Sequence, residues 1–277
     1  MSLIKYKSFK MNKIAIAITT VSLMFASCTK IIELDLNTAD PQIVVDAHLS
    51  DDQTEKATVQ LSKTVNFSAN NTFPPLSSAV VFIKNRTTGE VDTLKETSAG
   101  LYKGSKLVGK VGNTYDLTIL TGGKTITASS TIPRKVNLDS ISILQQSFFG
   151  NTRISLIPRY VDPKGIGDNY RFIVSVNGKV RKDIFTFNDE LSDGRLNGRP
   201  LFGGGGEDDE IKVGDTVTLE MQGIDAPSYL YFTTMAEGGG SRNSDSATPT
   251  NPVTNLKGAI LGYFSAYTTQ KKTITIK

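Results

Sequence analysis

The side chains that most limit the chemistry of this chain are its one histidine and its one cysteine. The histidine, His48, lies in the segment "VVDAHLSDD", at the end of a run of β-branched residues. A Ser-His-Asp triad could use it as the base, but the chain has no G-x-S-x-G sequence of the kind that presents a serine nucleophile. A structural zinc site takes four ligands, mostly nitrogen and sulfur, which one histidine and one cysteine do not provide. We therefore predict no catalytic residue and interpret His48 as a surface or structural residue.

Two acidic clusters form the other candidate site. They contain Asp189, Glu190 and Asp193 in one case and Glu207, Asp208, Asp209 and Glu210 in the other. Ca²⁺ takes six to eight oxygen ligands, which carboxylates can supply. The segment "DELSDG" begins like an EF-hand loop, but Leu191 stands at the third ligand position and Pro200 at the twelfth. A solvated acidic loop explains the pattern better than a calcium site, and we assign no metal and no cofactor.

The first 27 residues have the composition of a secretory leader. Four lysines and no acid are followed by a run of about fourteen mostly apolar residues, Ile14–Ser27. This run is too short to cross a bilayer, which takes about 20 apolar residues. The segment "FASC" then resembles the lipobox of bacterial lipoproteins, in which small residues precede a cysteine. The resemblance implies that the leader, 1–27, is removed, that Cys28 is lipidated, and that residues 28–40 tether the protein to a membrane.

Removal of the leader changes the charge of the chain. The leader contains four of the 31 lysines and arginines and none of the 27 aspartates and glutamates, so the mature chain carries 27 charges of each sign. The basicity of the full sequence therefore gives no reason to expect a nucleic-acid partner. The mature chain has no cysteine beyond Cys28, which excludes a disulfide framework.

After the tether, β-branched residues recur in short runs separated by turn signals. The first half contains such runs at 41–49, 56–64, 78–85, 90–96, 100–105, 113–121 and 124–132. The pair Gly122–Gly123 supplies the positive φ of a tight hairpin turn between the last two runs. About seven short strands in this space are typical of an immunoglobulin-like sandwich. We predict such a sandwich over residues 41–133.

The second half continues the pattern and adds one helix. Strands are predicted at 137–149, 152–162, 169–177, 179–188 and 215–224, a helix at 226–238, and a closing hairpin from 258–269 and 271–277. Tyr229, Phe232, Thr233 and Ala236 define the predicted buried face of the helix. Segments 189–210 and 238–252 are long loops, and either contact loops or tolerated insertions would explain them. The prediction is an all-β fold whose second, mainly β domain covers 134–277.

Several segments together resemble an uncharacterised family of Bacteroidetes outer-membrane lipoproteins, catalogued as a domain of unknown function. These segments are "PQIVVDAHLSD", "VGNTYDLTILTGGKTITASSTIP", "APSYLYFTTM" and "NPVTNLKGAILGYFSA". Members of that family are often encoded beside TonB-dependent (SusC-like) receptors. The resemblance implies a lipid-anchored outer-membrane protein at the cell surface, with a non-catalytic binding or accessory role in nutrient uptake. A structural or adhesive envelope protein is the alternative function. The periplasmic face of the outer membrane is the alternative location.

Four Asp-Ser/Thr-apolar triplets resemble the acceptor sequence of Bacteroidetes O-glycosylation. Their hydroxyl residues are Thr93, Ser140, Thr216 and Ser246. Triplets of this kind also arise by chance. We predict that at least one of the four carries a glycan, with Ser246, in the Gly/Ser-rich loop, as the best candidate.

Overall fold

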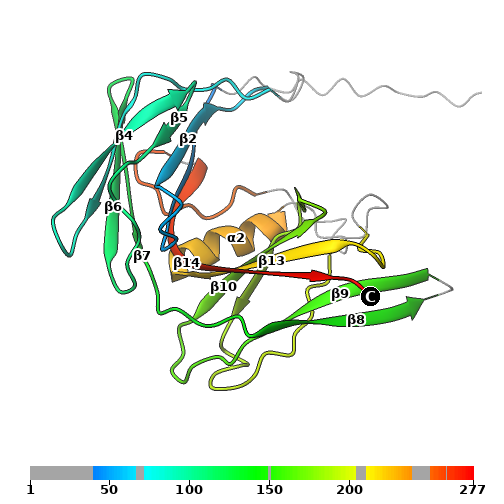
Figure 1. The fold of residues 1–277 in the computed structure, drawn as a ribbon. Helices are drawn as coiled ribbons and strands as arrows, with labels where there is room; N and C mark the ends of the chain where they lie inside the picture. Colours follow the sequence, from blue (N-terminus) through cyan, green and yellow to red (C-terminus); the bar gives the residue numbers. More distant parts are fainter. Residues whose placement is uncertain (1–39, 67–71, 149–150, 204–209, 239–249, 260) are drawn as a thin grey trace, which may run out of the picture. The chain divides into compact units, whose positions relative to one another are not determined.

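The computed structural model describes residues 40–66, 72–148, 151–203, 210–238, 250–259 and 261–277. These residues consist mainly of β-strands, with one helix, α2 (Ala226–Gly238), in the described part of the chain (Figure 1). The predicted all-β class is confirmed. No helix within the described ranges is long and apolar enough to cross a membrane.

The first seven strands form two layers over one hydrophobic core. One layer contains β1, β2 and β5, and the other contains β4, β3, β6 and β7, with β4 and β5 pairing where the layers join. The bounds are β1 (Ile43–Ser50), β2 (Thr58–Lys63), β3 (Val80–Asn85), β4 (Val91–Ser98), β5 (Leu101–Lys103), β6 (Thr114–Thr121) and β7 (Lys124–Thr131). Each of these strands overlaps a segment that the sequence predicted as a strand.

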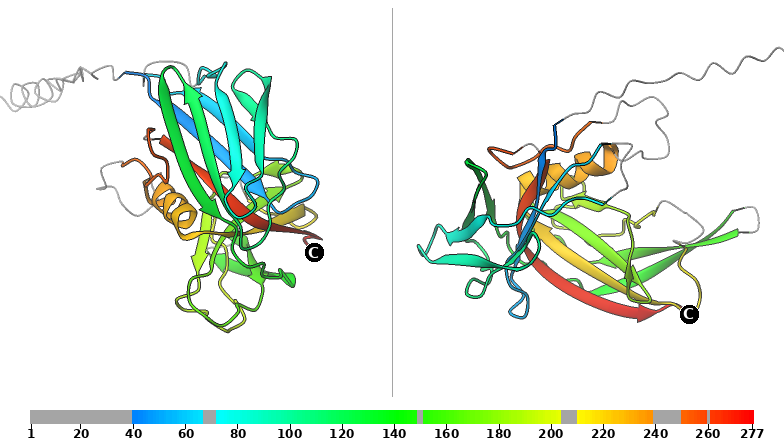
Figure 2. Two further views of the ribbon diagram at one scale, coloured as in Figure 1. Left: turned by 90° about the vertical axis from the view of Figure 1, so that its left-hand side faces the viewer. Right: turned by 90° about the horizontal axis from the view of Figure 1, so that it is seen from above.

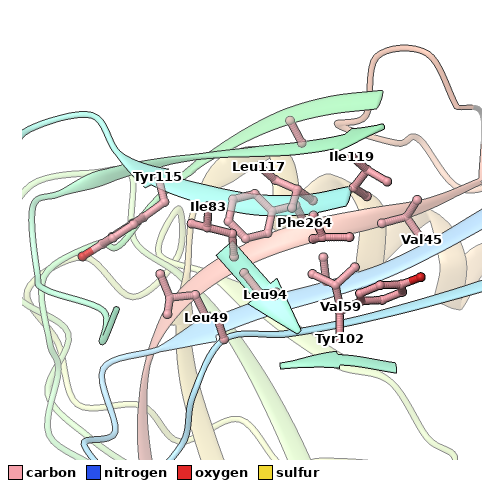
Figure 3. Packing of buried hydrophobic residues seen from close by; sticks show 14 of the residues in the cluster. Val45, Leu49, Val59, Ile83, Leu94, Tyr102, Tyr115, Leu117, Ile119 and Phe264 are labelled. Atoms are coloured by element: carbon pink, nitrogen blue, oxygen red, sulfur yellow. The ribbon is translucent and has the colours of Figure 1, made fainter. Parts of the chain in front are cut away.

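Alternation along each strand explains which side chains form this core. In β6, the side chains of Tyr115, Leu117 and Ile119 are fully buried, whereas the residues between them are only partly buried. Successive residues of a strand point to opposite faces of the sheet, so every second position meets the facing layer. Figure 3 shows these three side chains beside Phe264, which comes from the end of the chain.

The β6–β7 hairpin turns at the predicted glycine pair. Gly122 and Gly123 have φ angles of 53° and 72°, and Thr121 pairs with Lys124 directly across the turn. Both angles lie in the left-handed region, which glycine adopts without a steric penalty. The local sequence therefore determined this turn.

The second group of strands surrounds another hydrophobic core. Strands β10, β13 and β14 pair side by side, β11 and β12 both pair with β10, and β8 and β9 form a separate two-stranded sheet. The bounds are β8 (Ser140–Phe148), β9 (Asn151–Arg159), β10 (Asn169–Val176), β11 (Lys179–Val180), β12 (Phe185–Asn188), β13 (Thr216–Ile224) and β14 (Leu261–Thr275). The predicted strand 179–188 is thus divided in two. Tyr170 and Phe172 of β10 are among the buried residues of this core.

The predicted closing hairpin is wrong, because β14 is one continuous strand of 15 residues. The polar segment at 270–272 suggests a turn, but Gln270, Lys271 and Lys272 continue the pairing with β13. The first part of β14 pairs in parallel with β1, and the rest pairs with β13 in the antiparallel direction. Figure 1 shows β14, in red, running from the strands of the first core past β13 to the C-terminus.

The predicted domain boundary at residue 133 agrees with part of the structure, but the end of the chain crosses it. Ile132 belongs to the first core and Val136 to the second, which agrees with a change of core at that point. Phe264 and Ala266, near the end of the chain, nevertheless belong to the first core. Because β14 contributes to both cores, one strand links them. The division into domains 41–133 and 134–277 stays a prediction.

Helix α2 has the predicted bounds but buries a different face. The residue before it, Asp225, accepts a hydrogen bond from the Ser228 N–H at 3.0 Å, which is the interaction of an N-cap. The buried residues of the helix are Ser228, Tyr231 and Phe232, of which the predicted face included only Phe232. Figure 2 shows α2, in orange, beside β10 and β14. The helix packs Tyr231 and Phe232 against Tyr267 of β14 in a small third cluster.

Candidate functional site

A cavity of about 580 Å³ lies on the sheet face turned away from the two large cores. Its walls come from six neighbouring strands, in the order β10, β13, β14, β1, β2 and β5, and from the turn that precedes β2. The lining residues are Arg171, Ile173, Glu220, Gln222, Tyr263, Ser265, Tyr267, Asp46, His48, Thr58, Lys103, Thr54, Glu55 and Lys56. Nearly all are polar or charged, so the cavity is suited to a polar ligand.

The alternation that builds the cores also places these side chains. In β1, Val45 and Ala47 are fully buried in the first core, and Asp46 and His48 point to the opposite face. In β10, Phe172 faces the second core, whereas Arg171 lines the cavity. The apolar positions that stabilise the sheet thereby force the intervening polar residues into one shared surface.

Charges of both signs line the cavity, and some of them are already paired. The ammonium of Lys271, beside the cavity, lies 3.0 Å from a carboxylate oxygen of Glu55 and 3.5 Å from one of Glu220. Its hydrogen bond to Glu55 and its attraction to both carboxylates raise the pKa of Lys271. Ion pairs at the exposed edge contribute little stability, so these contacts chiefly hold the two acids in place. Lys56 and Lys103 are exposed on the same wall.

Arg171 is held against the helix. Its guanidinium carbon lies 3.8 Å from the centre of the Phe232 ring, and its Nη1 donates a hydrogen bond of 3.4 Å to Gln222 Oε1. Stacking on an aromatic face and a hydrogen bond restrict the rotamers of this long side chain. Arg171 is therefore a preorganised cation in the wall, suited to a carboxylate or phosphate group.

Asp46 and His48 form a weak pair on β1. Nδ1 of His48 lies 3.9 Å from Oδ1 of Asp46. Partial desolvation opposes the charge of Asp46, but the polar contacts of its carboxylate with His48 and Tyr263 outweigh that effect and lower the pKa of Asp46. Asp46 is thus an anion at neutral pH, on the same wall as the Arg171 cation.

Ser265 brings the three residue types of a catalytic triad onto one surface. It lies directly opposite His48 in the pairing of β1 with β14, and only 2% of its surface is exposed. Its hydroxyl has no hydrogen-bond partner, so His48 does not activate it as a nucleophile in this conformation. A buried hydroxyl without a partner is costly, and a ligand that hydrogen-bonds to it would relieve that cost.

Two tyrosines of β14, Tyr263 and Tyr267, line the cavity, and helix α2 packs against Tyr263. The rings of Tyr231 and Phe232 each lie 4.8 Å, between centres, from the ring of Tyr263. Burial raises the pKa of Tyr263 and of Tyr267, so both hydroxyls stay protonated at neutral pH. The two tyrosines therefore add aromatic surface and protonated hydroxyls to the cavity lining, beside the charged residues of β1 and β13.

The predicted modification sites have different surroundings. Cys28 and Ser246 lie outside the described residues. Thr93, Ser140 and Thr216 are all exposed, so their glycosylation stays a prediction. In the triplet at 92–94, however, Asp92 is fully buried and accepts hydrogen bonds from three backbone N–H groups. That aspartate has a structural role whether or not Thr93 is modified.

The predicted acidic loop is only partly solvated. Asp189 is 1% exposed, whereas Glu190 and Asp193 are exposed, and Glu210 is exposed beyond the segment 204–209 that is not described. The described part of the loop is held to β9, since the Leu201 N–H donates to the Leu156 carbonyl at 2.8 Å. Burial of Leu201 and of Asp189 shows why solvation alone does not explain this segment.

Sequence reasoning identified His48 but not the cavity around it. The remaining wall residues come from segments as far apart as Asp46 and Tyr263, which pair in the β1–β14 register. The alternation of polar and apolar residues in each strand predicts which side chains share a face of the sheet. It does not predict which strands are neighbours.

Comparison with known proteins places the chain in a family. No curated protein matches the sequence. A family model described as a domain of unknown function (DUF4249) matches residues 29–273, which is nearly everything after Cys28. The match includes every residue that lines the cavity and ends at residue 273, within β14. The chain therefore belongs to the DUF4249 family.

Proposed function

We propose that this protein is a non-catalytic binding lipoprotein of the bacterial outer membrane, anchored through Cys28, that serves a TonB-dependent nutrient uptake system. The observation that carries the binding role is the polar cavity of about 580 Å³ on the outer sheet face. A volume of this size fits a small molecule. The leader and the lipobox-like segment support the anchor, and the resemblance to lipoproteins encoded beside such receptors supports the uptake role.

The arrangement of charges favours a small ligand with groups of both signs. Arg171 is a fixed cation, and Asp46, whose pKa is lowered, is an anion on the same surface. The Ser265 hydroxyl offers a further, unpartnered hydrogen-bonding group. Amino acids and short peptides carry both a carboxylate and an ammonium group. We therefore propose a zwitterionic nutrient of this class as the ligand.

Replacement of Arg171 by methionine tests the cavity. We expect mature wild-type protein, titrated calorimetrically with a panel of amino acids, dipeptides and monosaccharides, to bind an amino acid or peptide. Arg171→Met should weaken that binding about tenfold or more, because a hydrogen bond to a charged group contributes about 1.5–3 kcal/mol. Methionine retains an apolar contact with the Phe232 ring, so the fold should be preserved.

Lys84→Met provides the matched control for that experiment. Lys84 is exposed on β3, which contributes nothing to the cavity wall, and its replacement removes the same charge. We expect its affinity to equal that of the wild type. Equal affinities for wild type and Arg171→Met would show that the cavity is not the binding site.

Purification from the native membrane tests the uptake role separately. We expect tagged, lipidated protein, extracted in mild detergent, to recover a TonB-dependent β-barrel receptor in stoichiometric amount. Cys28→Ser should lose both the lipid, seen as a change in intact mass, and the receptor. Recovery of the lipidated chain alone would contradict the accessory role and favour the structural or adhesive alternative.

A further inference from the structure

Three aspartates converge in the interior, away from the cavity described above. They are Asp162 after β9, Asp168 before β10 and Asp189 after β12. One carboxylate oxygen from each lies within 4.8 Å of the other two. Their exposed fractions are 0%, 7% and 1%, respectively. Carboxylates this close and this buried need compensating positive charge.

The surrounding protein supplies only part of that charge. Nε of Arg134 donates a hydrogen bond of 2.9 Å to Oδ1 of Asp168, and Nη2 donates to Oδ2, so this carboxylate is neutralised by a two-pronged ion pair. Asp189 accepts hydrogen bonds from the backbone N–H groups of Gly167 and Asp168, at 2.8 and 3.0 Å. These bonds bring no full positive charge. Three carboxylates and one guanidinium leave an excess of two negative charges.

One oxygen in the cluster has no partner at all. Oδ1 of Asp162 accepts a hydrogen bond from the Tyr170 hydroxyl, but Oδ2 of this fully buried residue has none. The nearby hydroxyl of the fully buried Tyr160 is also without a partner. A buried carboxylate oxygen with no donor indicates that a further group belongs there.

The spacing of the three oxygens fits a hard divalent cation. Ca²⁺ binds oxygens at 2.3–2.6 Å, so two oxygens on one ion can be separated by up to about 5 Å. The limit of 4.8 Å within the cluster satisfies this condition. Mg²⁺ dehydrates reluctantly and usually keeps several water ligands, which disfavours it among three buried carboxylates. We propose that Asp162, Asp168 and Asp189 bind one divalent cation, Ca²⁺ in preference to Mg²⁺.

The proposed ion would join connections that are distant in the chain. Asp162 and Asp168 begin and end the β9–β10 connection, whereas Asp189 starts the long loop that returns to β9. The site differs from an EF-hand because its ligands come from separate segments. Of the predicted acidic cluster, only Asp189 takes part. Asp193 instead accepts a hydrogen bond from the Gly165 N–H at 2.6 Å.

Titration of the mature protein with CaCl₂ tests the site directly. After dialysis against a chelator, we expect calorimetry to show one Ca²⁺ per chain and weaker binding of MgCl₂. At a hundredfold excess of Ca²⁺ over its Kd, the Tm should rise by about 5 °C or more. Asp162→Asn should abolish both the binding and the rise, because it removes a ligand charge while keeping the shape of the side chain.

Asp193→Asn is the matched control, since it neutralises an exposed aspartate of the same loop and keeps an acceptor for Gly165. We expect it to bind Ca²⁺ like the wild type. The absence of Ca²⁺ and Mg²⁺ binding by wild-type protein would overturn the proposal, whatever the variants do. If, in addition, Asp162→Asn were as stable as the wild type, the result would indicate that Asp162 is protonated and that no cation is bound.

Discussion

Replacement of Gly262 by alanine should lower the free energy of unfolding by about 4 kcal/mol or more. Gly262 lies opposite Val45 where β14 pairs in parallel with β1, and its φ is 103°. A Cβ atom at this position would lie 1.8 Å from the Val45 carbonyl oxygen and 2.6 Å from its carbonyl carbon. Backbone atoms of a paired strand cannot move aside without breaking the pairing. Urea denaturation of the mature chain, followed by circular dichroism, measures the loss.

Gly112→Ala separates the clash from the backbone strain. Gly112 has a φ of 80°, and no atom lies within 4 Å of the place a Cβ would occupy. Its replacement should cost about 1 kcal/mol, the penalty of a left-handed conformation without a collision. Similar losses in the two variants would contradict the close approach of β14 to β1. Because β14 contributes to both cores, the Gly262 variant should also lose the cavity and its ligand.

Replacement of Asp92 by alanine should cost about 3 kcal/mol or more. Oδ2 of this fully buried carboxylate accepts hydrogen bonds from the backbone N–H groups of Ser105, Lys106 and Leu107, at 2.9, 2.8 and 3.0 Å. Alanine leaves all three donors without this acceptor. The buried Leu107 donor costs about 1–3 kcal/mol when it is unsatisfied, and the part-buried donors of Ser105 and Lys106 add to that loss. Thermal and urea denaturation of the mature protein measure the effect.

Asp92→Asn is the matched variant, because an amide oxygen in the same place can still accept all three hydrogen bonds. We expect it to cost about 1 kcal/mol, since only the charge assistance is lost. Equal destabilisation by alanine and asparagine would show that the charge, rather than the acceptor, holds the 105–107 turn.

Local patterns in the sequence were sufficient to predict most of the strands and the helix. The alternation in β6 and the pair Gly122–Gly123 act over neighbouring residues, so they are readable without knowledge of the fold. The same is true of the bounds of α2, which begins after the cap residue Asp225. The anchor at Cys28 also rests on local sequence and stays a prediction.

Long-range pairing decided what the local patterns left open. A hairpin turn was predicted between 258–269 and 271–277, yet pairing with β13 continues through Gln270 and makes β14 one strand. The buried face of α2 follows from its packing against Tyr263 and Tyr267, which sequence spacing within the helix does not show. In each case the deciding partner lies far away in the chain.

The sequence by itself determined the all-β class, most strand positions and, with one cysteine, the absence of a disulfide framework. Only the tertiary structure decided that Asp46, Arg171 and Ser265 share one cavity, and that Asp162, Asp168 and Asp189 converge. The physical reason is that alternation specifies which face a side chain points to. The identity of the neighbouring strand is specified by burial of apolar surface across the whole fold, as the pairing of β1 with β14 illustrates.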